Sequence, residues 1–418
     1  MSDTSNCYDP NKNPSLLSVE KTLENIKNGI QQLSRIETLP IRDALGHVLA
    51  EEVISDINVP PHRNSAMDGY AIRFDDIKNN PETKLNLVGS SFAGEPFSGK
   101  VEAGQCIRIM TGAMMPADCD SVIMQEQVDR HEDVISVIGS HQANENVRFP
   151  GEDIKQSDVI VQPGKKITPA DLGLLSSIGI AEVTCYGKPK VAFFSTGDEL
   201  KSLGETLGPG DIYDSNRYTL FGMLKQMDVE IIDLGVIADD KDLIKQTLLD
   251  AADKADMVLT SGGASVGEAD YISEILNEIG AVNFWKIAMK PGKPLAFGQI
   301  NQIPFFGLPG NPVSVMATCY LFVQPAIRHL KGISNDNQLK LTARLQNDLK
   351  KAPGRTDFQR GILQQQDNGE LTVSTTGMQG SHILTSMSLA NCFIVLPKDS
   401  SNVNKDEMVE VMPFNDIL

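Results

Sequence analysis

Residues 256–271 read DMVLTSGGASVGEADY, and this stretch decides the fold. DMVLT is a short apolar run typical of a buried strand, and ISEILNEIG at 272–280 has the period of a helix. Three glycines interrupt the segment between them: Gly262, Gly263 and Gly267. A strand, a glycine-rich loop and a helix in this order expose backbone N–H groups that can bind a phosphate or another oxyanion. The stretch therefore predicts an α/β domain with an anion site at the end of a strand.

The chain on both sides of this stretch alternates between strand and helix patterns. Further strands are predicted at 191–195, 229–237 and 304–308, and helices at 214–227, 240–255 and 313–330. Strands that alternate with helices at this spacing are typical of an open, mostly parallel α/β sheet. We expect this domain to span residues 186–332.

The rest of the chain has other patterns. Apolar residues recur at helical spacing from 15 to 33, and a short helix is predicted at 168–180. Short alternating runs with frequent Gly and Pro predict a β-rich domain at 61–145, inserted into an N-terminal domain made of 1–60 together with 146–185. After a polar linker, 333–418 has the alternation of a C-terminal β domain resembling a barrel. The predicted fold class is multidomain, α/β plus β.

Composition limits the kinds of partner. The 418 residues carry a net charge of −18, with a pI near 4.8. General nucleic-acid binding needs a basic surface, so we expect no nucleic-acid partner. Solubility is the simplest reason for the acidity. An anionic small molecule still fits, because a local lysine cluster or bound Mg²⁺ can reverse the local field.

The cysteines and the N-terminus indicate a cytoplasmic protein. The six cysteines form no CxxC pair and the six histidines form no HExxH motif, so neither zinc nor a disulfide framework is expected. The N-terminus lacks the features of a signal peptide, and no apolar run is long enough for a membrane span. We therefore expect no membrane association.

Three polar motifs each follow a predicted strand. They are TGDEL at 196–200, SGGASVGEAD at 261–270 and PGNP at 309–312. Ligands of open α/β sheets bind beyond the carboxyl ends of the strands. Each glycine alone would most simply be a tight turn. Three motifs at one edge together predict a ligand site.

Four carboxylates lie at the predicted junctions between strands and helices: Glu199, Asp239, Asp240 and Asp270. A carboxylate in the first turn of a helix usually caps it or interacts with its dipole, and at least one of the four is expected to do so. Several of them beside a phosphate loop favour Mg²⁺, held by one or two carboxylates together with water and substrate oxygens.

Two further motifs fit either a structural or a ligand-binding role. Asn311 and Pro312 suit the cap and first position of a helix, and the same loop would face the anion site. Lys286, Lys290 and Lys293 occur in FWKIAMKPGKPLAFG. Three lysines usually belong to a solvated face, but apolar flanks and a proline-fixed turn suit them to binding a compact oxyanion.

Eight motifs in order resemble one known family across nearly the whole chain after its N-terminal tail. They are MDGYA, IMTGA, PGEDI, STGDEL, DSN, TSGGASVGEADY, KPGKP and LPGNPVS. The sequence resembles the molybdopterin molybdenumtransferases, the bacterial MoeA family to which the E domain of gephyrin also belongs.

The resemblance implies a function and an assembly. Family members insert molybdate into adenylylated molybdopterin in a Mg²⁺-dependent reaction that releases AMP and yields molybdenum cofactor. They are elongated homodimers with the active site in a cleft between subunits. Their α/β domain resembles MogA, the molybdopterin adenylyltransferase that makes the substrate, and transient contact with that enzyme is expected.

The resemblance also assigns roles to residues. It implies catalytic roles for Asp68, Thr111, Asp153, Glu199, Asp239 and Asp270, with the first three contributed by the other subunit. It implies Mg²⁺ ligands among Glu199, Asp240 and Asp270. It implies substrate contacts from Ser261, Gly262, Gly263, Ser265, Lys286, Lys290, Lys293, Pro309, Pro312, Arg355 and Ser381. Arg355 and Ser381 lie in looser motifs than the others.

Two alternative functions remain open from the sequence. One is a related phosphoanhydride enzyme on the same α/β fold, such as an adenylyltransferase or a nucleotide-processing amidase relative. The β-rich domain with MDGYA and PGEDI argues against it. The other is a scaffold that binds partner proteins, which would not require the carboxylates.

Overall fold

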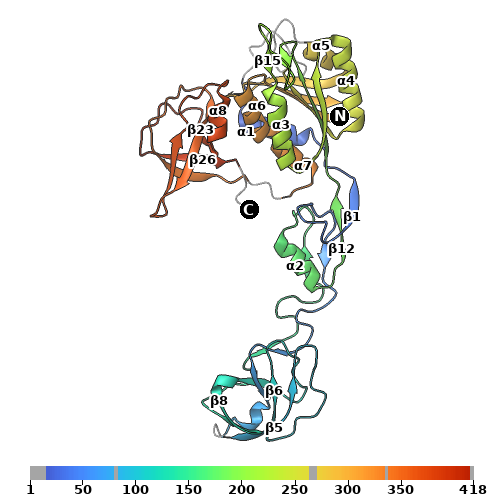
Figure 1. Cartoon of the computed structure of the whole chain (residues 1–418), viewed down its shortest axis with the longest axis vertical. Helices are drawn as coiled ribbons and strands as arrows, with labels where there is room; N and C mark the ends of the chain where they lie inside the picture. The colour runs from blue at the N-terminus through green and yellow to red at the C-terminus, as the bar shows by residue number, and fades with distance from the viewer. Residues whose placement is uncertain (1–15, 80–82, 263–270, 335–337, 415–418) are drawn as a thin grey trace, which may run out of the picture. The chain divides into compact units, whose positions relative to one another are not determined.

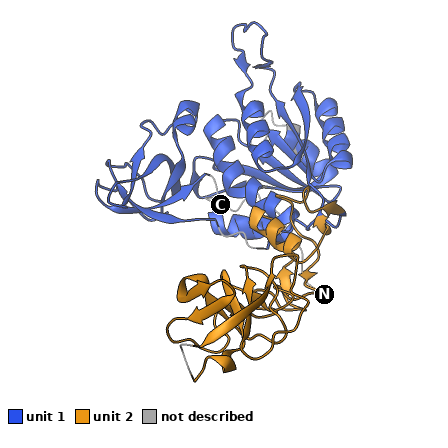
Figure 2. Cartoon of the chain, turned by 60° about the horizontal axis from the view of Figure 1, so that its bottom comes forward, with its two compact units in different colours: residues 1–37, 186–418 blue, residues 38–185 orange. Residues whose placement is uncertain are grey.

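Two compact units make up the chain in this computed structural model, which describes residues 16–79, 83–262, 271–334 and 338–414. The described residues up to Glu37 and those from Tyr186 onward form one unit, and Thr38–Cys185 form the other (Figure 2). In the described part of the chain, we find no helix with both the length and the apolar character that crossing a membrane needs.

A six-stranded sheet is the centre of the first unit (Figure 1). Its order is β16 (Glu230–Ile237), β13 (Lys190–Thr196), β17 (Met257–Ser261), β21 (Ile303–Leu308), β20 (Pro294–Ile300) and β18 (Gly280–Lys286). The first four are the predicted strands, and all pair in parallel. β20 and β18 pair antiparallel and were not predicted. The open, mostly parallel sheet is confirmed, with an antiparallel edge.

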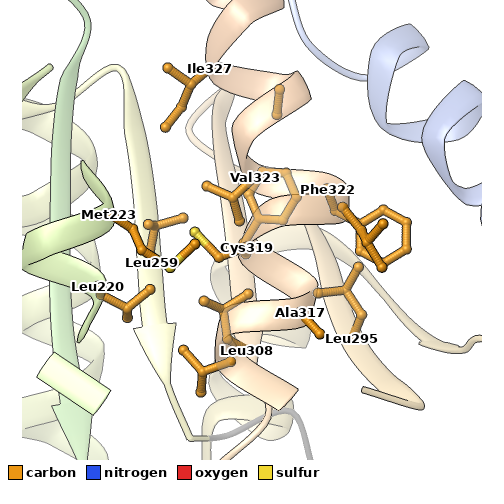
Figure 3. Close-up of a cluster of buried hydrophobic side chains, with 14 of the residues drawn as sticks. Leu220, Met223, Leu259, Leu295, Leu308, Ala317, Cys319, Phe322, Val323 and Ile327 are labelled. Carbon is orange, nitrogen blue, oxygen red and sulfur yellow. The ribbon is translucent and has the colours of Figure 1, made fainter. Parts of the chain in front are cut away.

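Helices cover both faces of this sheet. Successive side chains of a strand point to opposite faces, so both faces are apolar and each needs a layer of helices. Val191 and Phe193 of β13 point into one core, which also contains residues of α1 (Val19–Asn28), α3 (Ser215–Gln226) and α6 (Pro312–Thr318). Ala192 and Phe194 point into the other core, with residues of α4 (Lys241–Lys254) and α5 (Tyr271–Ile279). Figure 3 shows part of the first core, where Leu220 and Met223 face Leu259 and Cys319.

The predicted continuous helix at 313–330 is interrupted. It consists of α6, a π-helical turn η3 (Cys319–Val323), and α7 (Gln324–Leu330). Pro325 lies in the first turn of α7 and has no N–H to donate to the carbonyl of Leu321. A wider π turn at this point accommodates the missing bond and the proline ring.

The N-terminal helix is shorter than predicted, and it packs with the sheet. Ser18 caps α1 by accepting from the N–H of Lys21 at 3.1 Å, and Gly29 ends the helix. Val19 and Ile26 are buried in the same core as Phe193. This placement differs from the predicted grouping of 1–60 with 146–185. The exact domain boundaries stay a prediction.

The C-terminal strands form a closed barrel. β23 (Thr356–Gln365), β24 (Leu371–Thr375), β22 (Leu341–Leu345), β26 (Met408–Pro413) and β25 (Cys392–Leu396) pair in a ring that closes from β25 back to β23. A short helix, α8 (Leu384–Leu389), precedes β25. One strand from outside the barrel, β19 (Met289–Lys290), pairs in parallel with β23. The predicted barrel-like domain is confirmed.

The second unit contains the predicted β-rich region and a second small core. Its main sheet has the order β7 (Ser121–Met124), β4 (Gly69–Ile72), β6 (Gln105–Ile109), β5 (Lys84–Ser91), β9 (Val134–Val137) and β8 (Val128–His131). Residues from 44 to 53 share a separate core with residues from 154 to 185, including those of α2 (Pro169–Ser177). Thr168 and Asp171 form a capping box at the start of α2.

Short elements complete the structure. Four two-stranded sheets are formed by short strands. They pair β1 (Ile36–Pro40) with β12 (Glu182–Tyr186), β2 (Val53–Ile54) with β11 (Val159–Val161), β3 (Asn64–Ser65) with β10 (Val147–Arg148), and β14 (Leu200–Lys201) with β15 (Ile212–Tyr213). Two 3-10 turns, η1 (Phe74–Asp76) and η2 (Gln125–Gln127), flank strands of the β-rich sheet.

We predict opposite effects on stability for two glycine substitutions. A Cβ at Gly298 in β20 would lie 2.2 Å from the carbonyl oxygen of Ala281, so Gly298→Ala must move backbone and should destabilise by about 1–3 kcal/mol. A Cβ at Gly222 in α3 meets nothing within 4 Å, so Gly222→Ala should stabilise by roughly 0.5–1 kcal/mol. Calorimetric melting of both variants checks this, and a stable Gly298→Ala protein contradicts the tight β18–β20 approach.

Candidate functional site

A cavity of about 1160 Å³ lies where the α/β sheet meets the barrel. The α/β side contributes the loops after β13, β17 and β21 and the turn between β19 and β20. The barrel contributes residues from 348 to 359 and from 375 to 381. Each of the three motifs predicted to share one edge of the sheet therefore has a described residue on one cavity: Glu199, Gly262 and Pro309.

Seven of the predicted site residues line this cavity: Glu199, Gly262, Lys290, Lys293, Pro309, Arg355 and Ser381. Five others of the same unit do not. Ser261 is buried at the end of β17, Lys286 lies in β18, Pro312 begins α6, and Asp239 and Asp240 follow β16. Gly263, Ser265 and Asp270 lie outside the described residues. Asp68, Thr111 and Asp153 belong to the other unit.

Two glycines shape the α/β wall. Gly262 has φ of +98°, and a Cβ there would lie 3.2 Å from the carbonyl oxygen of Thr196. Gly197 has φ of +145°, and a Cβ there would lie 2.6 Å from the Glu199 carboxylate. Both positions require glycine. The second one lets the Glu199 carboxylate fold back over the loop at the rim of the cavity.

Asp239 is repelled by two neighbouring acids, Asp198 and Glu199. The pKa of Asp239 is raised, first by partial desolvation and then by the negative charges of Asp198 and Glu199. The next acid, Asp240, accepts from the N–H of Leu243 at 2.8 Å and caps α4, which is the structural role expected of at least one carboxylate. Among the described residues, no three His, Cys, Asp or Glu side chains are placed to hold a metal ion.

The lysine turn is fixed between the sheet and the barrel. Lys290 pairs in register with Asp357 of β23, and its ammonium lies 3.7 Å from that carboxylate, whose side chain is buried. Gly292 has φ of +93° and approaches Thr318 of α6. Lys293 lines the cavity and, within the described residues, forms no ion pair. These contacts hold the turn in place, with Lys290 and Lys293 at the cavity.

The PGNP loop does more than begin a helix. Asn311 occupies the cap position, but its side chain accepts no helix N–H and instead lines the cavity. The Asn216 amide donates to the carbonyl of Gly310 at 2.8 Å, and the N–H of Val313 donates to the carbonyl of Ser381 at 3.1 Å. Pro312 therefore begins the helix as predicted, Asn311 makes no side-chain cap bond, and a ligand-binding role of the loop stays a prediction.

The barrel wall depends on an arginine that sequence reasoning missed. Arg360 is 1% exposed, and it donates to the Ser386 hydroxyl at 3.0 Å and to the carbonyl of Gly380 at 3.1 Å. Its backbone N–H donates to the Gln379 side chain at 2.8 Å. Burial lowers the pKa of Arg360 to about 10. These bonds hold the loop that presents Gly380 and Ser381 to the cavity.

Other residues of the wall were also missed: Asp348, Lys350, Gln359, Thr375 and Gln379. Their local patterns are those of ordinary exposed turns and strands. Only Arg360 gave a usable signal, because it is a charge within the otherwise strand-like run TDFQRGIL.

In the second unit, two predicted residues form a pair. Asp68 accepts from the N–H and from the hydroxyl of Thr111, both at 2.7 Å. These bonds, the backbone one first, lower the pKa of Asp68, and the charge of Arg108 adds to the effect. Asp153 is exposed, and its N–H donates to the carbonyl of Val59 at 3.0 Å. The pair presents a fixed, ionised carboxylate.

Fold and site together define a multidomain α/β protein with a lysine-lined cavity at the carboxyl ends of its parallel strands. Family models match nearly all of it: the MoeA N-terminal region (domain I and II) at 17–179, a probable molybdopterin binding domain at 192–329, and the MoeA C-terminal region (domain IV) at 342–414.

Known proteins match this chain over more than nine tenths of its length. The molybdopterin molybdenumtransferase of Haemophilus influenzae is 46% identical over 92% of this chain and 95% of its own. Gephyrin of Dictyostelium discoideum is 33% identical over 94% of this chain and 61% of its own. The MoeA crystal structure from Pyrococcus horikoshii superposes with a TM-score of 0.83 at 31% identity, over 96% of this chain and 100% of that one. The chain belongs to the MoeA family of molybdopterin molybdenumtransferases.

We predict that Thr111→Val raises the pKa of Asp68. The substitution removes the hydroxyl donor and keeps the backbone donor, so part of the lowering remains. The carboxyl carbon of Asp68 in a ¹³C NMR titration reports the change. Thr111→Ser keeps a hydroxyl and is the matched control. An identical titration in Thr111→Val and the parent protein contradicts the hydrogen bond.

We predict that Asp239→Asn stabilises the protein at neutral pH. Because the folded state raises the pKa of Asp239, its ionised form destabilises the fold above that pKa. The advantage of asparagine should disappear as the pH falls through the raised pKa toward the ordinary aspartate value of about 3.9. Melting temperatures across this range check it, and a pH-independent difference contradicts the repulsion.

Proposed function

We propose that this chain transfers molybdenum from molybdate to adenylylated molybdopterin, with release of AMP and formation of molybdenum cofactor. The observation that carries the proposal is the cavity, where lysines of the PGKP turn and Glu199 line the same space. A cavity with this charge arrangement fits a ligand that carries several negative charges and a metal ion. The names of the full-length relatives support the same reaction.

The cations would bind the two anionic reactants. Molybdate is a dianion, and the adenylyl group adds phosphate charge, so their approach is repulsive without fixed positive groups. Lys293, Lys290 and Arg355 supply these groups from both walls. Lysine acts as a compact point charge and arginine as a planar fork that matches two oxygens of an oxyanion. Ser381 and the Gly262 backbone add neutral polar contacts.

The acids would hold Mg²⁺. Asp239 is repelled by two neighbouring acids, so a cation there relieves unfavourable charge, and carboxylate oxygens are the ligands that Mg²⁺ prefers. One or two carboxylates suffice when water and phosphate oxygens complete the set, which fits Glu199 with Asp239. When bound, Mg²⁺ would neutralise charge on the adenylyl phosphate and ease cleavage of its phosphoanhydride bond. Asp270 remains a proposed member of this set.

The proposal also includes three residues of the other unit: Asp68, Thr111 and Asp153. Asp68 is held ionised by Thr111, which suits it to orient a cationic or hydroxyl group of the substrate. We propose that these residues act in the cavity of a second subunit, so that a homodimer is the active form. Contact with a molybdopterin adenylyltransferase would let the adenylylated substrate pass directly to this cavity.

We predict that Lys293→Met lowers kcat/KM for AMP release on the order of 100-fold, since it removes one preorganised charge from the cavity. The assay combines adenylylated molybdopterin, molybdate and Mg²⁺ and measures AMP. Lys293 is the better choice than Lys290, because removing Lys290 would leave the buried Asp357 without its ion pair.

Lys340→Met is the matched control, since Lys340 pairs with Glu410 and does not line the cavity. Parent protein that releases no AMP under these conditions contradicts the transferase proposal. AMP release that does not depend on molybdate favours a related phosphoanhydride enzyme. Cofactor formation in cells that survives loss of Lys293 and Glu199 together favours a scaffold.

A further inference from the structure

One histidine of the second unit has a hydrogen-bond acceptor at each of its ring nitrogens. The Nδ1 atom of His141 lies 3.1 Å from the Glu145 carboxylate, and the Nε2 atom lies 3.0 Å from the carbonyl oxygen of Ile138. A neutral imidazole donates from only one nitrogen, whereas an imidazolium donates from both. Both contacts are therefore hydrogen bonds only when the pair of side chains holds one proton more than a neutral ring beside a carboxylate.

The ring is shielded from water, and its carboxylate partner is the nearest unbalanced charge. The side chain of His141 is 1% exposed and lines a cavity of about 510 Å³ between η1 and the end of β9. The charged groups on and around η1 are Arg73, Asp75, Asp76, Lys78 and Asp120. Of these, Lys78 lines the same cavity, and its ammonium pairs with Asp75 at 2.9 Å. Gain or loss of one proton therefore acts mainly on the contact with Glu145, where little water screens the charges.

Residues 138–146, which we call the histidine loop, are bonded to β7 at the edge of the β-rich sheet. The Glu145 carboxylate also accepts from the N–H of Gln142 at 3.0 Å, and the carbonyl of Glu145 accepts from the N–H of Val122 at 2.9 Å. The Asn146 amide donates to the carbonyl of Val122 at 3.0 Å. The contact between the two side chains therefore holds the loop in the shape that reaches β7.

Closure of the histidine loop has a conformational cost. Asn144 and Asn146 have φ of +65° and +55°, in the left-handed region that is unfavourable for residues with a side chain. The N–H of Asn144 donates to the Ser121 hydroxyl at 3.0 Å, which offsets part of this cost. A loop with such a cost depends on its hydrogen bonds, so loss of the charged contact at His141 should favour opening.

The histidine loop also holds the turn that bears Asp68. The carbonyl of Asn146 accepts from the N–H of Ala66 at 2.8 Å. On the other side of the turn, the N–H of Ser65 donates to the carbonyl of Ala113 at 3.0 Å, in the loop of the threonine that pairs with this aspartate. The position of the aspartate relative to its threonine partner therefore depends on the histidine loop as well.

We propose that His141 is a proton-dependent positioning residue for the Asp68–Thr111 pair. With its proton, the histidine loop is closed and the turn is held. Without it, the lone pair of Nδ1 faces the Glu145 carboxylate and the loop opens. The closed loop binds a proton that the open loop releases, so closure weakens as the pH rises. Histidine ordinarily changes charge between about pH 5 and pH 8, so the response falls in that range.

Amide hydrogen exchange of the full-length chain tests the proposal at Ala66. Its protection, corrected for the intrinsic pH dependence of exchange, should fall on the order of tenfold between about pH 5 and pH 8. In His141→Gln, whose amide cannot carry the charge, protection should not depend on pH. Glu145→Gln should behave in the same way. His131→Gln is the matched control, because His131 is an exposed histidine of β8 in the same unit, and it should behave like the parent chain.

The carboxyl carbon of Asp68 shows whether the loop acts on the pair. Its ¹³C signal should change over the same pH range in the parent chain and stay constant over that range in His141→Gln. Protection of Ala66 that is constant with pH in the parent chain overturns the proton dependence, and so does an equal response in His141→Gln. A response of Ala66 without any response of Asp68 overturns the positioning role.

Two features keep the test decisive. If His141→Gln does not fold, Glu145→Gln removes the same charged contact and decides the outcome. Neither measurement uses a substrate, so failure of the proposed reaction would leave both results unchanged and is distinguished from failure of this inference.

Discussion

The pairing of β19 with β23 is the constraint on which the site depends. Two residues of the α/β domain, Met289 and Lys290, pair with Thr356 and Asp357 of the barrel, and the N–H of Thr356 donates to the carbonyl of Ala288 at 2.8 Å. This pairing places the lysine turn against the barrel and the barrel loops over the strand ends. The bond from Val313 to Ser381 and the core shared by Phe322 and Phe393 hold the same two walls together.

The charge distribution follows from this constraint. Glu199 lines the cavity after β13, and the cations lie on the turn and on the barrel, so a ligand in the cavity meets both signs. The chain as a whole is acidic, with a net charge of −18, so the cavity differs from its average surface. Fixed local cations are the simplest way for an acidic protein to bind anions.

Local sequence patterns predicted much of the fold. The four parallel strands were visible because each is an apolar run bounded by turn residues. The pairing of β18 with β20 was missed because the prolines and glycine of PGKP, between the two strands, were interpreted only as a turn. The break in the helix at Pro325 was missed because the surrounding residues continue the apolar pattern. Closure of the barrel depends on pairing between β23 and β25, which are far apart in sequence.

The site was predictable only in part, because some of its residues are brought together by contacts between segments far apart in sequence. Glu199 and Pro309 were found because they stand in motifs after strands, and Lys290 and Lys293 because they stand in a turn fixed by prolines. Lys350 reaches the cavity only through the barrel fold, so no local pattern marks it, and the signal for Arg360 is a charge within a strand-like run. Ser261 was expected to contact the ligand, but it completes β17 and pairs with Ser195 and Leu308 on either side.

The central claim is that one cavity binds the anionic reactants between the lysine turn and the barrel. A crystal structure of the chain grown with AMP and molybdate tests it most directly. We expect oxyanion density within hydrogen-bonding distance of Lys290 or Lys293 on one wall and of the barrel on the other. Well-ordered ligand bound elsewhere on the chain, with this cavity filled only by water, would contradict the account.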